Sequence, residues 1–213
     1  MESTALDYGA YYHIYNRGTN GEVLFKHNKY YSEFLELYTE YIVPVADTLA
    51  YCLMSNHFHL LIRVKAESEI HTFNELGMFM KKANNNPLKK PTPSNQFKHL
   101  FLTYAKKINT AYIRTGSLFE HPFERRMIDH ENYLRDCIVY IHNNPVKHGF
   151  ADSPGDYKWS SFNAIISDKP TLIERPFVLE LFGGKEDFLN FHGDFKTLNK
   201  LQNIDKLQNI VDF

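Results

Sequence analysis

The chain has 213 residues, of which 43% are hydrophobic and 15% aromatic, and its formal net charge at pH 7 is −1. That length suits one domain with extensions, or two small domains, and the apolar content is sufficient for a core. The first nine residues lack the basic start and apolar stretch of a secretion signal. No run approaches the roughly 18 apolar residues of a membrane-spanning helix. We therefore expect a soluble, cytoplasmic protein in which Cys52 and Cys137 are ordinary core thiols.

The charge is unevenly distributed along the chain. Between Leu76 and Arg126 there are ten basic residues and only two acidic ones, a local net charge of +8, so the rest of the chain carries −9. A polyanion responds to the local field rather than to the average charge. The segment is therefore a candidate nucleic-acid surface, and the alternative is a solvated helix face followed by a basic loop.

The first third of the chain predicts a strand, a helix and a hairpin. Residues 11–16 (YYHIYN) are aromatic and β-branched, which favours a strand. Apolar residues recur at helical spacing over 31–42. Two apolar runs, 49–54 and 57–64, are separated only by Ser55-Asn56, which is typical of a tight antiparallel hairpin.

Further elements follow up to the end of the chain. They are a short helix over 73–83, an exposed proline-rich loop over 84–95, a long amphipathic helix over 97–112, a strand over 123–128, a helix after Asp129, and short helices over 159–166 and 176–182. Asp129 is the expected cap of its helix, and Asn144-Pro145 the expected end. A near repeat over 200–210 indicates a terminal helix or a loose arm.

The order β-α-β-β-α-β followed by a helix predicts an α+β fold. It suits a ferredoxin-like antiparallel sheet, as in RRM or palm domains, with helices packed on one face. We expect a main domain over 1–162 and a C-terminal extension of unknown role over 163–213.

His57-Phe58-His59 is the first candidate site. Side chains alternate along a strand, so His57, His59, Leu61 and Arg63 share one face. Two imidazoles at this spacing stand about 6–7 Å apart at Cα and can reach one metal ion, with positions left for oxygen ligands. The alternative is two partly buried histidines satisfied by hydrogen bonds.

Tyr140 and Asn144 are the second candidate pair. They are four residues apart on the predicted helix and are therefore neighbours on its surface. A tyrosine hydroxyl can attack phosphorus if a divalent cation polarises the phosphate, and an amide oxygen is a hard ligand suited to Mg²⁺ or Mn²⁺. The alternative for Tyr140 is a boundary tyrosine that only packs its ring.

Four motifs together resemble a known family. They are, in chain order, YHIYNRG (12–18), CLMSNHFHLLIRV (52–64), YIHNNPVKHGF (140–150) and DYKWSSF (156–162). Residues 11–162 resemble the single-tyrosine HUH transposases, and among them the REP-associated tyrosine transposases. The remaining C-terminal residues resemble no family.

The resemblance implies a role for each matching position. His57 and His59 would bind Mg²⁺ or Mn²⁺, and Tyr140 would form a 5′-phosphotyrosine link to DNA. Asn144 stands where relatives place a polar metal ligand, often glutamine, and Ser55 stands where they commonly have proline. Such enzymes act on single-stranded DNA, usually beside a folded-back hairpin, and need no nucleotide cofactor. Whether the protein is a monomer or a homodimer stays open.

The basic span would then contact DNA phosphates. The expected contacts are Lys81, Lys82, Lys89, Lys90, Lys106, Lys107, Arg125 and Arg126. Tyr104 or Tyr112 could stack on bases, although core packing is the alternative for each. Arg63 could hold a phosphate or pair with a neighbouring acid.

Three functions compete on the sequence alone. The first is a metal-dependent transposase or endonuclease that uses Tyr140 on single-stranded hairpin DNA. The second is a metal hydrolase in which His57 and His59 activate water and Tyr140 is incidental. The third is a domesticated, non-catalytic protein that only binds DNA hairpins.

Overall fold

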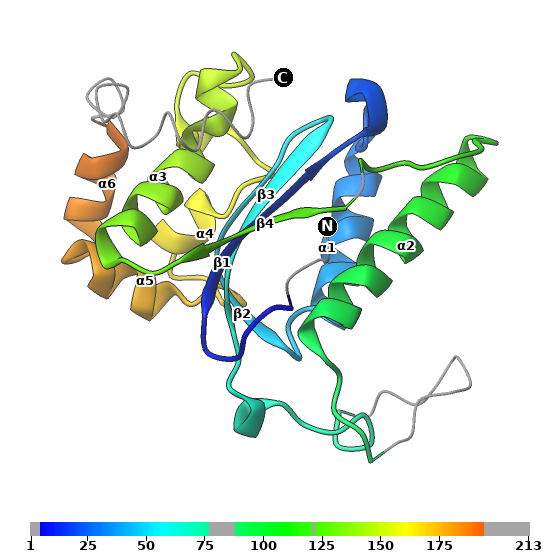
Figure 1. Cartoon of the computed structure of the whole chain (residues 1–213). Helices are drawn as coiled ribbons and strands as arrows, with labels where there is room; N and C mark the ends of the chain where they lie inside the picture. Colours follow the sequence, from blue (N-terminus) through cyan, green and yellow to red (C-terminus); the bar gives the residue numbers. More distant parts are fainter. Residues whose placement is uncertain (1–4, 77–87, 121, 194–213) are drawn as a thin grey trace.

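The computed structural model describes residues 5–76, 88–120 and 122–193. At its centre lies a four-stranded antiparallel sheet with the strand order β2-β3-β1-β4 (Figure 1). The strands are β1 (Tyr11–Arg17), β2 (Ala46–Leu53), β3 (His57–Val64) and β4 (Glu124–Ile128). β2 and β3 form the predicted hairpin, and the turn between them is closed by the Met54 N–H, which donates to the His57 carbonyl at 2.8 Å.

The helices complete the predicted order. They are α1 (Asn28–Tyr41), α2 (Pro93–Ala111), α3 (Glu131–Lys147), α4 (Phe162–Ile166), α5 (Arg175–Phe182) and α6 (Lys185–Gly193). Short 3-10 turns occur at Thr19–Gly21, Glu67–Glu69 and Pro154–Asp156. The order β-α-β-β-α-β and the antiparallel sheet confirm the expected α+β, ferredoxin-like fold.

The helices cover both faces of the sheet, whereas the sequence led us to expect one. α1 and α2 lie on one side, and α3 to α6 on the other (Figure 1). The reason lies in β3: Phe58 and Leu60 pack into the core beneath α1 and α2, while Leu61 packs into a second core with α3. A central strand that is apolar on both faces needs a covering layer on each.

Tyr104 belongs to the first core. Its side chain is fully buried, and its hydroxyl donates to the Leu24 carbonyl at 2.9 Å. Its ring packs edge-on against Phe34. Base stacking by Tyr104 is therefore excluded in this conformation, and the core alternative is the one the structure shows. Tyr112 is only partly buried and lies under the Lys26 ammonium group, 4.1 Å from its ring centroid.

The second core joins α3 to the segment after Phe162. Leu134, Ile138 and both cysteines contribute to it from α3 and β2, and Phe162, Val178 and Phe188 contribute from the later helices. Cys52 and Cys137 are buried and free, as expected. The described residues on both sides of the expected boundary therefore share one core, and the division at Phe162 stays a prediction.

The chain between Trp159 and Glu174 covers the outer edge of β2. The Leu53 N–H donates to the Trp159 carbonyl at 2.9 Å, and the Ser161 N–H donates to the Tyr51 carbonyl at 3.0 Å. Farther along, the Glu174 N–H donates to the Thr48 carbonyl at 2.9 Å. These bonds satisfy backbone groups that an edge strand would otherwise expose.

Two predictions about the ends of α3 were wrong. The N-cap is His130 rather than Asp129, because His130 is the last residue with extended backbone angles (φ −128°, ψ 138°) before the helix. The helix also passes through Pro145 and ends at Lys147. Proline removes one donor close to the helix end, and the last turn is closed by the His148 N–H, which donates to the Asn144 carbonyl at 3.0 Å.

Some sequence predictions fall outside the described residues. The predicted helix over 73–83 is described only to residue 76, where the chain forms a turn, and the 200–210 repeat is not described. Lys81 and Lys82 lie outside the described residues as well. Among the helices that the structure describes, none is both long and apolar enough to cross a membrane.

Candidate active site

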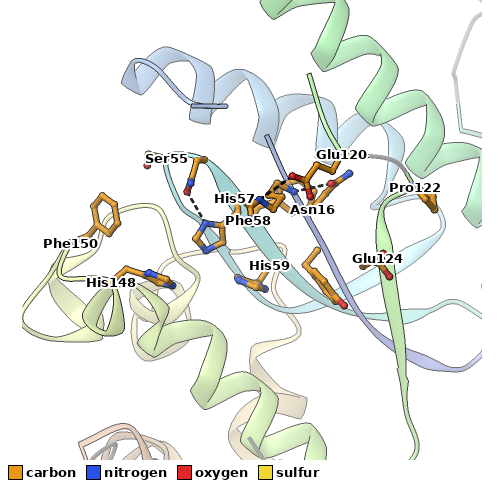
Figure 2. Close-up of a pocket in the computed structure, with 13 residues that line it drawn as sticks. Asn16, Ser55, His57, Phe58, His59, Glu120, Pro122, Glu124, His148 and Phe150 are labelled. Atoms are coloured by element: carbon orange, nitrogen blue, oxygen red, sulfur yellow. Dashed lines mark hydrogen bonds and ion pairs between the residues drawn. The ribbon is translucent and has the colours of Figure 1, made fainter. Parts of the chain in front are cut away.

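The pairing of β1 with β3 places the two histidines of the His-x-His motif. His57 lies opposite Arg17 and His59 opposite Tyr15, so all four side chains share the sheet face that α3 covers. This confirms the strand alternation expected from the sequence. Figure 2 shows His57 and His59 with His148 on one side of a cavity, and Glu120 and Glu124 on the other.

His57 is held between two asparagines. Its Nδ1 lies 2.9 Å from Asn56 Oδ1, and its Nε2 lies 3.5 Å from Asn144 Oδ1. Amide oxygens only accept, and a neutral imidazole carries a single N–H, so His57 can donate to only one of the two. The shorter contact favours the proton on Nδ1, which then donates to Asn56, and Nε2 keeps its lone pair. Two acceptor atoms, His57 Nε2 and Asn144 Oδ1, therefore face each other, an arrangement that a shared cation would stabilise.

His59 is held by a third histidine. Its Nδ1 lies 3.0 Å from His13 Nε2. Its other ring nitrogen, Nε2, is buried and has no hydrogen-bond partner among the described residues. Leaving a buried polar atom without a partner costs about 1–3 kcal/mol. A metal ion bound at Nε2 would remove this cost.

Burial keeps these imidazoles neutral. Desolvation, together with a smaller contribution from the nearby His148, lowers the pKa of His57 to about 4. Desolvation also holds the pKa of His59 well below its ordinary value, with an added contribution from His13. Both rings are thus uncharged at pH 7, which is the form that ligates metals.

The donor set fits a divalent cation only if the amide takes part. Within residues 5–76, 88–120 and 122–193, no group of three or more His, Cys, Asp or Glu side chains is placed to hold a metal. Two imidazole nitrogens and the Asn144 amide oxygen make a mixed set of nitrogen and oxygen ligands. The buried Nε2 of His59 and the opposed acceptors of His57 and Asn144 support this fit.

Tyr140 lies on α3 beside the histidines. Its ring centroid is 5.6 Å from that of His59 and 6.2 Å from that of His13, edge-on in both cases. Asn144 follows one helical turn later and is 1% exposed. Tyr140 itself is only 3% exposed, and it is not among the residues that line the cavity. The structure brings the four predicted residues together, with Tyr140 beneath the cavity wall.

The cavity has a volume of about 530 Å³ and contains residues that the sequence reasoning missed. The residues that line it include Asn56, Glu120, Glu124 and His148, and His13 contacts the lining residue His59. His13 and His148 fall within two of the four family-like motifs, YHIYNRG and YIHNNPVKHGF, so the motifs contained the signal. Their proximity to His59 and His57 depends on strand pairing and helix docking, which the sequence does not state.

The predicted basic contacts are in different environments. Lys107 pairs with Glu33 at 3.4 Å, and the Lys90 ammonium donates to the Glu67 carbonyl at 2.7 Å. Lys89 lies in a short turn of the loop before α2. None of these three residues lines the histidine cavity, and Lys90 and Lys107 are already engaged within the protein.

Arg125 and Arg126 point to opposite faces of β4. Arg126 lies opposite His13 and so shares the face of the histidine site, whereas Arg125 lies opposite Ile14 on the α2 side. Arg63 is bound by two carboxylates: its Nε donates to Asp47 at 3.0 Å, and its guanidinium also contacts Glu69 at 3.1 Å. The ion-pair alternative is thus the one observed for Arg63.

Comparison with known proteins gives the same family as the sequence motifs. No family model matches the chain. A putative REP-associated tyrosine transposase of Haemophilus influenzae is 25% identical over 117 residues, which cover 55% of this chain and 59% of the relative. The chain resembles the REP-associated tyrosine transposases. The matched region, at 59%, is less than two thirds of this relative's length.

A solved structure supports the fold. The structure of a REP-associated tyrosine transposase bound to a REP hairpin matches with a TM-score of 0.54 and 14% identity, covering 80% of this chain and 89% of that chain. The match confirms the resemblance of the sheet and its helices to the REP-associated tyrosine transposase fold. At this identity it shows the fold alone.

Proposed function

We propose that this protein is a metal-dependent transposase-like enzyme that cleaves and rejoins single-stranded, hairpin-forming DNA through a tyrosine. The observation that carries the proposal is the meeting of His57 and His59 on β3 with Tyr140 and Asn144 on α3, beside a cavity that the two histidines line. The similarity to REP-associated tyrosine transposases supports the class of substrate.

The reaction needs one bond to form and one to break. The Tyr140 hydroxyl oxygen attacks a DNA phosphorus and forms a 5′-phosphotyrosine, and the bond from phosphorus to the 3′ oxygen breaks. The hydroxyl proton leaves tyrosine, and the departing 3′ oxygen takes up a proton. Attack by a 3′ hydroxyl on the phosphotyrosine reverses these steps, so no nucleotide cofactor is consumed. A divalent cation, Mg²⁺ or Mn²⁺, would polarise the phosphate and offset its developing charge.

Each neighbouring residue has a defined part. His57, His59 and Asn144 would hold the cation. Asn56 accepts from His57 Nδ1 and so keeps Nε2 available. Tyr140 is 3% exposed, so its ring must turn toward the cavity before it can reach a phosphate there.

The burial of Tyr140 favours a second candidate. His57 and His59 line the cavity while Tyr140 does not, which is the arrangement a metal hydrolase with an activated water would use. A non-catalytic hairpin-binding protein is the remaining alternative. The three functions differ in whether DNA becomes attached to the protein and in whether it is cut.

The test is a denaturing gel of end-labelled hairpin DNAs incubated with the protein and Mn²⁺. We expect a covalent adduct that disappears in Tyr140→Phe and persists in Tyr133→Phe, a matched control on the same helix. His57→Ala should abolish the adduct as well. Cleavage that survives in Tyr140→Phe without an adduct would establish the hydrolase, and binding without any cleavage would establish the binding protein.

A further inference from the structure

Arg17 is the sole lysine or arginine among the described residues that line the histidine cavity. It lies opposite His57 in the pairing of β1 with β3, so its side chain shares the face of the two histidines. Its charge reaches the site: desolvation and His148 lower the pKa of His57 most, and Arg17 adds to the lowering. A guanidinium is charged at any physiological pH, so the cavity contains one permanent cation beside the candidate metal ligands.

Glu120 is placed against this cation by backbone pairing. Beyond the end of β1, Gly18 forms an antiparallel bridge with Phe119, and the Glu120 N–H donates to the Arg17 carbonyl at 3.0 Å. Arg17 and Glu120 are therefore opposite each other, and their side chains share a face. The Arg17 Nε lies 3.3 Å from a Glu120 carboxylate oxygen (Figure 2). The cation of the cavity is thus engaged with a carboxylate that also lines the cavity.

This ion pair is open to exchange. The Arg17 side chain is 28% exposed and that of Glu120 is 47% exposed, and ion pairs in contact with solvent are weak. A phosphodiester offers two charged oxygens that match the fork of a guanidinium, which makes a stronger, charge-assisted contact. A phosphate in the cavity can therefore displace Glu120, whose carboxylate can turn to solvent.

The charge of the cavity gives the exchange a consequence. Glu124 lines the cavity as well, so Arg17, Glu120 and Glu124 sum to +1 − 2 = −1. A divalent cation would bring the sum to +1, which one phosphodiester neutralises. While Glu120 is paired with Arg17, the guanidinium charge is offset, and the cavity attracts anions less than it would with Arg17 released.

We propose that Arg17 binds the phosphate that Tyr140 attacks, and that Glu120 restrains Arg17 until the DNA displaces it. The inference rests on the proposed function, because it takes the DNA substrate and the attack by Tyr140 from there. Arg17 touches the reacting phosphate, whereas Glu120 acts only through Arg17. The two residues consequently affect DNA binding in opposite directions.

The first test is fluorescence anisotropy of labelled DNA hairpins with single-stranded flanks, in Mn²⁺ and about 0.1 M salt. We expect Arg17→Gln to weaken binding by about 10–100-fold, since a hydrogen-bonded charge contact is lost. Glu120→Gln should tighten binding by about 2–5-fold, the range of an exposed ion pair. A gain of affinity cannot arise from misfolding, so this variant keeps the test valid if Arg17→Gln is unstable.

Glu124→Gln is the matched control, because it removes the same charge from the same cavity. Its gain should be smaller than that of Glu120→Gln and should persist in an Arg17→Gln background. The gain from Glu120→Gln should fall in that background to the level of the control, since no guanidinium remains to be released. Equal gains from the two glutamate variants in the wild-type background, or unchanged binding in Arg17→Gln, would overturn the inference.

The second test identifies the phosphate. A methylphosphonate linkage replaces one charged phosphate oxygen with a methyl group and can be introduced at each position in turn. We expect the affinity loss of Arg17→Gln to vanish at one linkage, the one that wild-type protein joins to Tyr140. A loss that persists at every linkage, or vanishes only at an uncleaved one, contradicts the contact. Failure of the proposed function would appear separately, as wild-type protein that binds no hairpin or forms no adduct.

Discussion

The Nδ1 atom of His59 lies 3.0 Å from the Nε2 atom of His13, and both rings are almost fully buried. One proton must lie between these two nitrogens, since desolvation lowers the pKa of His13 to about 3 and holds that of His59 well below its ordinary value. When His59 donates that proton, its Nε2 carries a lone pair and can ligate a cation. If His59 binds a cation through Nε2, as proposed above, His13 accepts the Nδ1 proton and so sets the tautomer of His59.

Replacing His13 should weaken metal binding without removing a ligand. We expect His13→Phe to lower Mn²⁺ affinity by about 10–100-fold, because His59 loses the acceptor that orients it. His13→Gln retains an amide oxygen that can accept and should restore most of the affinity. Calorimetric titration with Mn²⁺ measures both. Equal affinity in wild type and His13→Phe would show that His13 does not act through His59.

The C-terminal helix α6 is attached to α3 by a defined chain of hydrogen bonds. His192 Nδ1 donates to the Phe188 carbonyl at 2.7 Å, so its Nε2 accepts from His142 Nδ1 at 2.9 Å. His142 Nε2 then accepts from the Ser161 hydroxyl at 2.7 Å. We expect His192→Phe to reduce the free energy of unfolding by about 1–3 kcal/mol, because the buried His142 N–H loses its acceptor.

Urea unfolding measures this loss, and a double-mutant cycle with His142→Phe isolates the contribution of the pair. If the coupling energy were near zero, α6 would be held by its apolar contacts alone.

The same two histidines should make stability depend on pH. Desolvation lowers the pKa of His192 to about 4 and holds that of His142 well below its ordinary value near 6.5. Below pH 6.5 the unfolded chain binds protons that the folded chain excludes, so stability present above pH 6.5 is lost as the pH falls toward 4. Each buried histidine contributes at most about 1.4 kcal/mol per pH unit in this window.

Unfolding free energies measured between pH 7 and pH 5, above the range of most carboxyl groups, should therefore fall with decreasing pH. The slope should be smaller in His192→Phe. A slope unchanged by that substitution would show that His192 does not titrate in this way.

Tyr104→Phe should affect stability and leave DNA binding unchanged. The Tyr104 hydroxyl donates to the Leu24 carbonyl within the first core, so its removal should cost about 1 kcal/mol of unfolding free energy. Thermal unfolding and hairpin-binding assays on the same variant separate the two roles. Weaker DNA binding with unchanged stability would point instead to a base-stacking role.

The strands and the placement of the candidate site residues were predictable because they depend on local periodicity. The alternation of His57, Phe58 and His59 fixes which side chains share a face, and the spacing of Tyr140 and Asn144 fixes their position on one helix. The family-like motifs then connected the two elements. Each of these inferences uses residues close together in the sequence.

What the sequence did not predict depends on packing between distant segments. The contact of His13 with His59 follows from the β1–β3 register, and that of His142 with His192 from the docking of α6. The sequence did not show that α3 packs on the second face of the sheet, so it did not predict helices on both faces. Pro145 was misjudged because the general cost of proline in a helix is small within a last turn closed by other hydrogen bonds.

The measurement that tests the central claim most directly is mass spectrometry of the protein after reaction with single-stranded hairpin DNA and Mn²⁺. Nuclease and protease digestion would leave a nucleotide on the residue that attacked the phosphate. We predict a phosphodiester-linked nucleotide on Tyr140, and none in protein kept with a chelator. A nucleotide on any other residue, or DNA cleaved with no modified peptide, would contradict the assignment of Tyr140 as the nucleophile.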